Sequence, residues 1–310
     1  MKKYSGRKIA VAVSGGVDSV TLLHWLARLN FDLIALHVNH GLRAAAKAEE
    51  EYVRRISAGL GVPCAVFHWT GPKPASGLES AARDARYKLM TDYCRAQGID
   101  ILVTAHQADD QIETFLMNLG RGSGVYGLAA MRAESTRDGI IIARPLLTVF
   151  RSELAEYCNR NNIGYFSDEM NDDERYTRVR IRKNRRLLND EMGISDSRIL
   201  LAIRNLSRTR QALDEYVASR AAGVLEKDYA RFNESFLFDE PPDIRLRLLG
   251  TIIQNVGENS YNPRLNSLEK ALDGLLNNCK FTLGRCTLRR LGDDILIVPE
   301  GSSASFGKRK

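Results

Sequence analysis

The segment SGGVDS, Ser14–Ser19, directly follows the first apolar run of the chain. It combines a flexible backbone with two hydroxyl groups and a carboxylate. Its two glycines allow a sharp turn that brings backbone N–H groups close to a ligand. The start of a helix adds a positive dipole and the serines add donors, so the segment predicts an anion site. The lysine and spacing of a Walker A loop are absent, and Asp18 stands in the loop, where it could help to hold Mg²⁺ beside phosphates. The alternative is an ordinary turn between a strand and a helix, because serine, glycine and aspartate are common turn residues.

A second set of reactive groups lies in TAHQADDQIET, Thr104–Thr114. His106 follows an apolar strand directly, at a position where a ligand would lie. Asp110 and Glu113 are three residues apart on the helix expected next, so they share a face. Such groups can accept a proton or hold a cation. The alternative is structural: Asp109 and Asp110 would then favour the helix dipole, and His106 would be a hydrogen-bonded core histidine.

Basic residues gather in two further places. Arg83, Arg86 and Tyr87 are spaced to lie on one face of a helix, where they would contact phosphate or simply face solvent. The stretch Arg175–Arg186 holds seven lysines and arginines and no acid, and Tyr176 adds a stacking surface. Charge localised in this way predicts contact with nucleic-acid phosphates, and unpaired bases stack well on tyrosine and arginine.

Short apolar runs that alternate with segments of helical period must position these groups. Strands are expected at Lys8–Val13, Leu33–Val38, Cys64–Trp69, Ile101–Thr104 and Ile140–Ala143. Helices are expected from Val17, over Ala45–Leu60, Glu79–Gln97 and Asp109–Leu119, and at Ser152 as an N-cap. This alternation predicts an α/β fold with a mostly parallel sheet and helices on both faces. Ligands in such sheets bind at the carboxyl ends of the strands.

The alternation stops near residue 165, and a different pattern follows. A long charged helix at Ile199–Leu225 is expected to link two domains. Two shorter helices, Ile244–Gln254 and Leu265–Asn277, precede a hairpin at 281–298 that turns at Gly292–Asp294. We therefore expect two domains, a larger one at residues 1–215 and a smaller α+β one at 216–310.

Composition narrows the class of protein. The 310 residues are 44% hydrophobic and 27% charged, which suits two globular domains. No run approaches the roughly 18 apolar residues of a membrane span, so we expect no membrane association. The five cysteines form no C-x-x-C pair, which argues against a zinc or iron–sulfur site and fits a reducing cytoplasm. The net charge of +7 is compatible with a polyanionic partner and also with an ordinary basic protein.

The loop Ser14–Ser19 resembles the pyrophosphate-binding loop of the N-type ATP pyrophosphatases, which cleave ATP between the α- and β-phosphates and transfer AMP to an oxygen. Further segments stand in the order found in the tRNA(Ile)-lysidine synthetase family, and the resemblance covers residues 8 to about 185. They are HVNHGLR (His37–Arg43), SAARDARY (Ser80–Tyr87), TAHQADDQIET (Thr104–Thr114), RGSGVYGLAAM (Arg121–Met131), RPLL (Arg144–Leu147) and SDEMNDDERYTRVRIR (Ser167–Arg182).

The resemblance implies a reaction in two steps. ATP adenylates the C2 carbonyl oxygen of the wobble cytidine in the anticodon stem-loop of tRNA(Ile), and free L-lysine then displaces AMP. It implies His106 and Asp110 as the catalytic pair, and Glu113 is the candidate contact for lysine. ATP would be bound by Ser14, Gly15, Gly16, Val17, Asp18, Ser19, His37, Asn39 and His40, Mg²⁺ by Asp18 and Asp109, and tRNA by Arg83, Arg86, Arg175, Arg178, Arg180 and Arg182.

The chain departs from the family pattern at three positions. Gln107 stands in place of a histidine, Met170 in place of a serine and Val179 in place of an asparagine. Each change removes a hydrogen-bonding group. The chain is also shorter than the long members of the family, which carry an additional C-terminal domain. The resemblance therefore implies a PP-loop catalytic domain at residues 1–215 and a single small tRNA-recognition domain at 216–310.

Three rival interpretations remain at this point. A tRNA 2-thiolation enzyme shares the superfamily, but those that act on cytidine use C-x-x-C pairs. GMP synthetase shares the SGGVDS loop but carries a glutaminase domain. A catalytically inactive tRNA-binding homologue would be expected to lack Asp18 or Asp110, and both are present. The sequence does not distinguish a monomer from a homodimer. It also does not show which acid is the base and which acid holds the metal.

Overall fold

The structure is a computed structural model of the chain, and it describes residues 1–310 except 42–45, 72, 75–76, 167–176, 260–261 and 303–310. The chain divides into two compact units, Met1–Ser207 and Arg208–Lys310. Helix α8 (Asp196–Ala222) crosses from the first unit into the second. The expected domain boundary between residues 215 and 216 stays a prediction.

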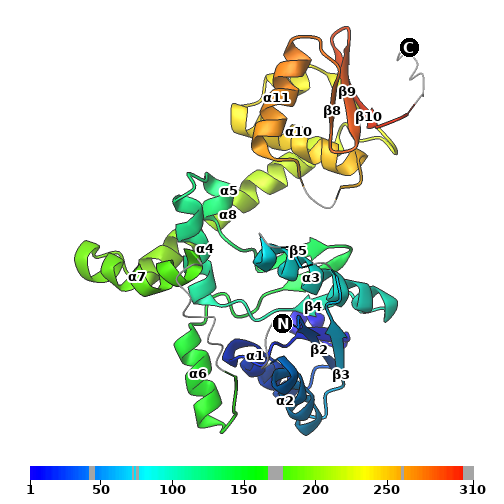
Figure 1. The fold of residues 1–310 in the computed structure, drawn as a ribbon. Helices are drawn as coiled ribbons and strands as arrows, with labels where there is room; N and C mark the ends of the chain where they lie inside the picture. The colour runs from blue at the N-terminus through cyan, green and yellow to red at the C-terminus, as the bar shows by residue number, and fades with distance from the viewer. Residues whose placement is uncertain (42–45, 72, 75–76, 167–176, 260–261, 303–310) are drawn as a thin grey trace. The chain divides into compact units, whose positions relative to one another are not determined.

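A six-stranded sheet with the order β3-β2-β1-β4-β6-β5 forms the centre of the first unit (Figure 1). Its strands are β1 (Ile9–Ala12), β2 (Leu33–Asn39), β3 (Cys64–His68), β4 (Ile101–Val103), β5 (Glu134–Arg137) and β6 (Ile140–Ala143). Neighbouring strands are parallel except β5 and β6, which pair antiparallel. The prediction of a mostly parallel sheet is confirmed. The edge strand β5 was not predicted, because its sequence ESTR has no apolar run.

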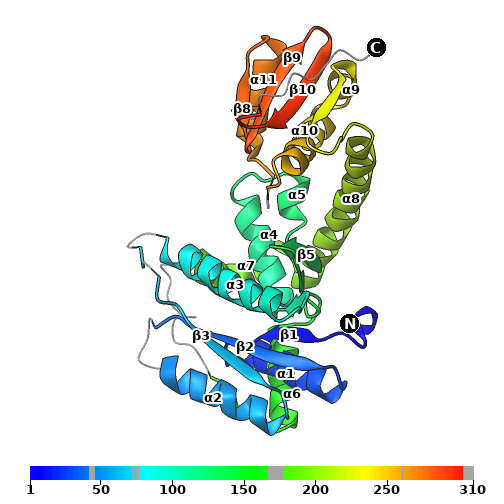
Figure 2. The same ribbon diagram turned by 90° about the vertical axis from the view of Figure 1, so that its right-hand side faces the viewer.

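Helices cover both faces of this sheet (Figure 2). One face carries α1 (Val17–Arg28), α2 (Ala46–Gly59) and α6 (Arg151–Arg160), and the other carries α3 (Leu78–Ala96). Side chains alternate between the faces along a strand. In β1, Ile9 and Val11 therefore pack with α1 and α6, while Ala10 joins the core under α3.

A further group of helices in the first unit consists of α4 (Ala108–Leu119), α5 (Val125–Leu128), α7 (Thr177–Met192) and the first part of α8. Ile112 of α4 packs with Ile199 and Ile203 of α8, so α4 is held from behind by an apolar contact. Helix α7 was not predicted, because its arginine-rich sequence leaves few apolar positions for a helical period. It contains most of the basic stretch singled out above.

The expected N-cap at Ser152 is wrong. Helix α6 begins at Arg151, and Phe150 is its N-cap residue. The Glu153 carboxylate accepts a hydrogen bond from the Phe150 backbone N–H at 2.8 Å, so an acid at the third helical position does the capping from inside the helix.

The second unit pairs an antiparallel sheet of order β7-β10-β9-β8 with helices. Its elements are β7 (Ala230–Asn233), α9 (Ser235–Phe238), α10 (Pro242–Val256), α11 (Leu265–Leu276), β8 (Phe281–Leu283), β9 (Cys286–Leu291) and β10 (Asp294–Pro299). The predicted turn lies between β9 and β10, where Gly292 has a φ of +65°. A second turn at Gly284 and Arg285, both with a φ of +57°, divides the predicted first strand into β8 and β9.

Candidate active site

A cleft of about 450 Å³ opens in the first unit at the carboxyl ends of β1, β2 and β4. This is the edge at which parallel sheets place their ligands. Its lining includes these predicted site residues: Ser14, Gly16, Val17, Asp18, Ser19, His37, Asn39, His40, Arg86, His106 and Asp110. The cleft thus brings the loop 14–19 and the two predicted catalytic residues together.

The loop 14–19 combines a left-handed turn with an uncapped helix start. Gly15 has a φ of +94°, a conformation that strains any side chain with a Cβ. Its carbonyl accepts a hydrogen bond from the Phe166 N–H at 2.9 Å, which fixes the turn from a distant part of the chain. The Ser19 hydroxyl donates to the Gly16 carbonyl at 3.0 Å. No side chain of the described residues caps the amino end of α1, so its first N–H groups are available to an anion.

Asp18 lies in the first turn of α1 and faces the cleft. Burial raises the pKa of its carboxyl to about 6, and the Arg151 guanidinium opposes this shift. Its Oδ1 atom is buried and has no hydrogen-bond partner in the described part of the chain. A buried carboxylate oxygen without a partner is costly, which fits a bound cation at this position.

His106 stands just beyond the end of β4. Its Nδ1 atom shares a 2.9 Å hydrogen bond with the Thr104 hydroxyl, which orients the ring. Burial lowers the pKa of His106 well below its ordinary value, and the positive charges of Arg83 and Arg144 lower it further. The ring is therefore neutral at pH 7, with Nε2 left for a ligand.

Asp110 is held at the start of α4 by a capping arrangement. Its Oδ2 atom accepts a hydrogen bond from the Gln107 N–H at 3.0 Å, and Gln107 Oε1 accepts from the Asp109 N–H at 2.5 Å. Burial raises the pKa of Asp110, and the Gln107 N–H opposes the shift. Gln107 therefore acts as the N-cap of α4, and the expectation that this departure from the family pattern removes a hydrogen-bonding group is wrong.

Two further acids of α4 are ion-paired with α7. Asp109 Oδ1 lies 2.6 Å from Arg185, and its Oδ2 accepts from the Arg151 backbone N–H at 3.0 Å. Glu113 is fully buried, and its Oε1 accepts from Arg182 at 2.8 Å. Burial raises the pKa of Glu113, and Arg182 opposes this shift. Neither acid lines the cleft in this structure.

The predicted face of α3 carries a cluster of guanidinium groups around a buried ring. The Tyr87 ring centroid lies 5.3 Å from Arg83, 5.7 Å from Arg86 and 4.7 Å from Arg137 of β5. These are cation–π distances. Tyr87 and Arg86 line the cleft, so the cluster places positive charge at its margin, on the side of His106.

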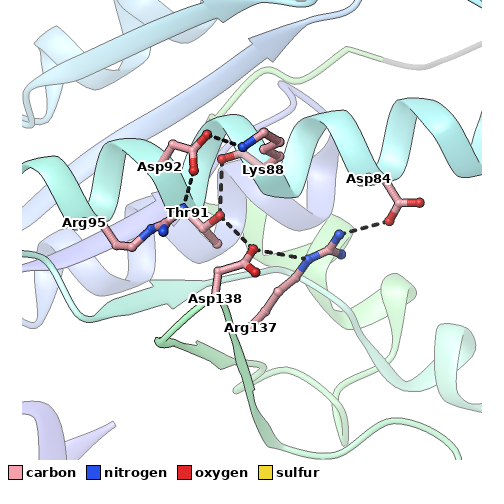
Figure 3. Close-up of polar contacts among 7 residues, drawn as sticks. All are labelled: Asp84, Lys88, Thr91, Asp92, Arg95, Arg137 and Asp138. Atoms are coloured by element: carbon pink, nitrogen blue, oxygen red, sulfur yellow. Dashed lines mark hydrogen bonds and ion pairs between the residues drawn. The ribbon is translucent and has the colours of Figure 1, made fainter. Parts of the chain in front are cut away.

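A polar network fastens the β5–β6 hairpin to α3 and so fixes Arg137 (Figure 3). Arg137 pairs with Asp84 of α3 at 3.0 Å. The hairpin residue Asp138 accepts a hydrogen bond from Thr91 of α3 at 3.3 Å. The edge strand that sequence analysis missed therefore supports the arginine cluster.

His37 Nδ1 and the side-chain amide of Asn39, both on β2, are hydrogen-bonded within the protein. His37 Nδ1 donates to the Val13 carbonyl at 2.8 Å, which joins β2 to the start of the loop 14–19. Asn39 Nδ2 donates to Glu50 Oε2 at 3.1 Å, and Asn39 Oδ1 accepts from the Gly41 N–H at 2.9 Å. Both residues border the cleft and shape it.

The predicted basic residues of α7 do not form one surface. Arg182 points inward to Glu113, and Arg180 is exposed and donates to the Thr177 hydroxyl at 3.1 Å. Arg178 is half-buried, and its charge acts on His106 and Asp110. Val179 is buried, so its apolar side chain is part of the packing of α7. Arg43, Met170 and Arg175 lie outside the described residues.

Sequence reasoning missed several residues of the cleft wall, among them Glu49, Met90, Thr104, Arg151 and Phe166. Arg151 matters most, because its charge acts on Asp18 and its backbone N–H holds Asp109. No local spacing indicates this role, since the contacts join segments far apart in the sequence.

No described helix is both long and apolar enough to cross a bilayer. No group of three or more histidine, cysteine, aspartate or glutamate side chains in the described part of the chain is arranged to hold a metal ion. A cation at Asp18 would need ligands from a substrate or water as well.

Comparison with known proteins gives the family. A PP-loop domain model matches residues 1–189. A tRNA(Ile)-lysidine synthase from Wolbachia pipientis wMel is 36% identical over 96% of this chain and 72% of its own length. One from Rhodopseudomonas palustris is 35% identical over 94% of this chain and 90% of its own length.

Among solved structures, the U34-tRNA thiolase NcsA from Methanococcus maripaludis resembles this chain with a TM-score of 0.55. The match covers 66% of this chain and 72% of that one at 17% identity, and it supports the fold alone. The alignments with the two synthases cover most of this chain and most of each relative. The residues matched by the PP-loop model include every residue that lines the cleft. The chain therefore belongs to the tRNA(Ile)-lysidine synthase family of PP-loop proteins.

Proposed function

We propose that this enzyme ligates free L-lysine to C2 of the wobble cytidine of tRNA(Ile) with a CAU anticodon, with ATP as the energy source. The products are lysidine, AMP and pyrophosphate. The observation that carries the proposal is the single cleft that joins the loop 14–19 to His106 and Asp110 in a chain of this family. We place the reaction in the cytoplasm, where a tRNA-modifying enzyme meets its substrate.

In the first step, the C2 carbonyl oxygen of cytidine attacks the α-phosphorus of ATP, and the bond from that phosphorus to the bridging oxygen of pyrophosphate breaks. The loop 14–19 receives the pyrophosphate, because the N–H groups at the start of α1 have no side-chain cap and the hydroxyls of Ser14 and Ser19 line the same cleft. His106 and Arg86 lie across the same cleft, where they can stabilise charge on the α-phosphate.

Asp18 is the residue that we assign to Mg²⁺, because its buried Oδ1 lacks a partner among the described residues. Asp109 is the weaker candidate, since Arg185 and the Arg151 N–H engage its two oxygens. Bound Mg²⁺ would neutralise phosphate charge that develops during adenylation.

In the second step, the ε-amine of lysine attacks C2, the C2–N bond forms and the C2–O bond to AMP breaks. The attacking ammonium must first lose a proton, and Asp110 is our candidate base. Its pKa is raised by burial, which makes it a stronger base than an exposed aspartate. Neutral His106 can hydrogen-bond the leaving phosphate through Nε2.

We assign the lysine substrate to Glu113 and the tRNA backbone to the basic residues of α3 and α7, with Arg83, Arg86, Arg178 and Arg180 as the contacts. Arg83 and Arg178 have no ion pair within the described part of the chain, so their charge is available to phosphate. Binding through several phosphates predicts an affinity for tRNA that falls as salt rises.

Incorporation of labelled lysine into unfractionated bacterial tRNA, with ATP and Mg²⁺, tests the function directly. We expect label in an isoleucine tRNA, with release of AMP and pyrophosphate. ATP cleavage on addition of tRNA without label in the tRNA would retain the PP-loop chemistry and rule out lysine as the nucleophile.

Replacing Asn39 with alanine is expected to raise the KM for ATP by about 3- to 10-fold with little change in kcat. Asn39 holds the segment that follows β2 through hydrogen bonds to Glu50 and Gly41, and each such bond is worth about 1 kcal/mol. Initial rates of pyrophosphate release at varied ATP give both constants.

Glu50→Gln is the matched control for this prediction, because glutamine still offers Asn39 an acceptor. Its KM should change less than that of Glu50→Ala. A fall in kcat for Asn39→Ala at unchanged KM would instead place the Asn39 side chain in the chemical step.

A further inference from the structure

Glu113 of α4 is a buried carboxylate that is only half satisfied. Its side chain is 1% exposed. Oε1 accepts from both Nε and a terminal nitrogen of Arg182, each at 2.8 Å. Oε2 is buried and has no hydrogen-bond partner among the described residues. Buried carboxylate oxygens are normally paired, so this one indicates a site built to accept a further donor.

Arg182 contacts the buried Glu113 carboxylate and is itself partly exposed to solvent. It is 35% exposed, so its guanidinium contacts the buried carboxylate on one side and water on the other. Arg178 and Arg186 lie one helical turn away on either side, and residues 177–189 of α7 contain no acid. Arg182 therefore has other arginines one turn away on either side, and an approaching phosphate backbone offers it a second anionic partner.

A cationic group already occupies the carboxylate that we assign to lysine. Guanidinium and alkylammonium ions compete for the charge of one carboxylate, and Arg182 already engages the Oε1 atom of Glu113. The apparent affinity for lysine is then reduced by the fraction of molecules in which Arg182 is away from Glu113.

We propose that Arg182 holds the place of the substrate's ammonium group on Glu113, and that RNA phosphates on α7 draw it away, so that lysine binds tightly only after RNA. The inference rests on the proposed function, because it takes Glu113 as the lysine contact. It also has a chemical use: a nucleophilic amine stays away from ATP until the cytidine has arrived. Because coupling between two ligands is reciprocal, lysine should tighten RNA binding by the same factor.

The opposite role for Arg182 would be a direct contact with the carboxylate of lysine. The two roles predict changes of opposite sign when the guanidinium is removed. A place-holder competes with lysine, so Arg182→Gln should bind lysine more tightly in the absence of RNA. A direct contact would make the same variant bind lysine more weakly.

Equilibrium dialysis of labelled L-lysine against the full chain, with a non-hydrolysable ATP analogue, measures this effect. The RNA is an anticodon stem-loop with the sequence CAU, present or absent. For the wild type we expect RNA to tighten lysine binding about tenfold, within the usual range of coupling between sites. For Arg182→Gln without RNA we expect lysine binding about tenfold tighter than in the wild type, with less than about a twofold further gain from RNA.

Arg185→Gln is the matched control, because Arg185 makes the other ion pair between α7 and α4, to Asp109, and does not touch Glu113. It should keep the RNA dependence of the wild type. Equal or weaker lysine binding by Arg182→Gln, or wild-type lysine binding that does not respond to RNA, would overturn the inference. The wild-type measurement needs no variant, so it stands even if Arg182→Gln fails to fold. Failure of the proposed function is seen separately, as absence of lysine incorporation into tRNA by the wild type.

Discussion

Asp110→Asn is expected to lower the rate of lysidine formation by about 10²- to 10⁴-fold while the protein stays folded. The reason for intact folding is local. Asp110 Oδ2 caps α4 by accepting from the Gln107 N–H, and the carbonyl oxygen of an asparagine can accept the same bond. The substitution therefore removes the negative charge and the proton acceptor but keeps the cap. Single-turnover transfer of labelled lysine measures the chemical step, and circular dichroism melting checks the fold.

Asp110→Ala separates catalysis from capping. Alanine should lose the same activity and in addition destabilise the protein by about 0.5 to 2 kcal/mol, because the Gln107 N–H then lacks its acceptor. Asp109→Asn is the neighbouring control: its ion pair with Arg185 is structural in this fold, so we expect a loss of stability and a smaller loss of rate. A rate for Asp110→Asn within tenfold of the wild type would remove Asp110 from the chemistry.

The sheet could be predicted because its strands are buried on both faces. Runs such as Ile9–Ala12 and Ile101–Val103 must be apolar throughout, and that pattern is visible in one sequence. The position of the cleft followed from the same fact, since parallel strands place their carboxyl ends at one edge. The loop 14–19 and His106 were found because they follow such strands directly.

The contacts that tune the site could not be predicted, because they join residues far apart in the sequence. Glu113 was identified from its spacing to Asp110, but nothing local shows that Arg182 would cover it. Arg151 was missed for the same reason, although its charge acts on Asp18. Helix α7 was not predicted because few of its side chains are apolar, and Val179 is its one buried residue among those described. Its position depends on ion pairs to Asp109 and Glu113.

Asp18→Asn is expected to stabilise the ligand-free protein and to abolish its response to Mg²⁺. Burial raises the pKa of this carboxyl from an ordinary value of 3.8 to about 6 in the folded state. The folded protein therefore binds the proton more tightly than the unfolded chain does. Stability is lost as the pH rises from about 4 to about 6, and above that range the loss is complete. A difference of this size corresponds to an upper limit of about 3 kcal/mol at pH 7.

Asparagine removes the ionisation, so the gain in stability should depend on pH in a defined way. Wild type and Asp18→Asn should differ least in unfolding temperature near pH 4, where the carboxyl is protonated in the folded state and only about half ionised in the unfolded chain. At pH 7 the variant should melt several degrees higher, since 1 kcal/mol shifts the midpoint by about 2 to 4 °C in a protein unit of this size. Melting curves across pH 4 to 8 without divalent ions test this, and an equal difference at every pH would contradict the assigned ionisation.

Mg²⁺ with an ATP analogue should reverse the order of stability, because a cation on Asp18 stabilises only the folded wild type. Magnesium then competes with the proton for one carboxylate, so its apparent affinity in the wild type should fall about tenfold for each pH unit below 6. Activity should be lost in Asp18→Asn by a factor of at least about 10². The more stable variant would then be the inactive one. This is expected where a residue is needed for function and lowers the free energy of unfolding. If Asp18→Asn keeps its response to Mg²⁺, the metal must be bound by other residues, and Asp109 would be the first to test.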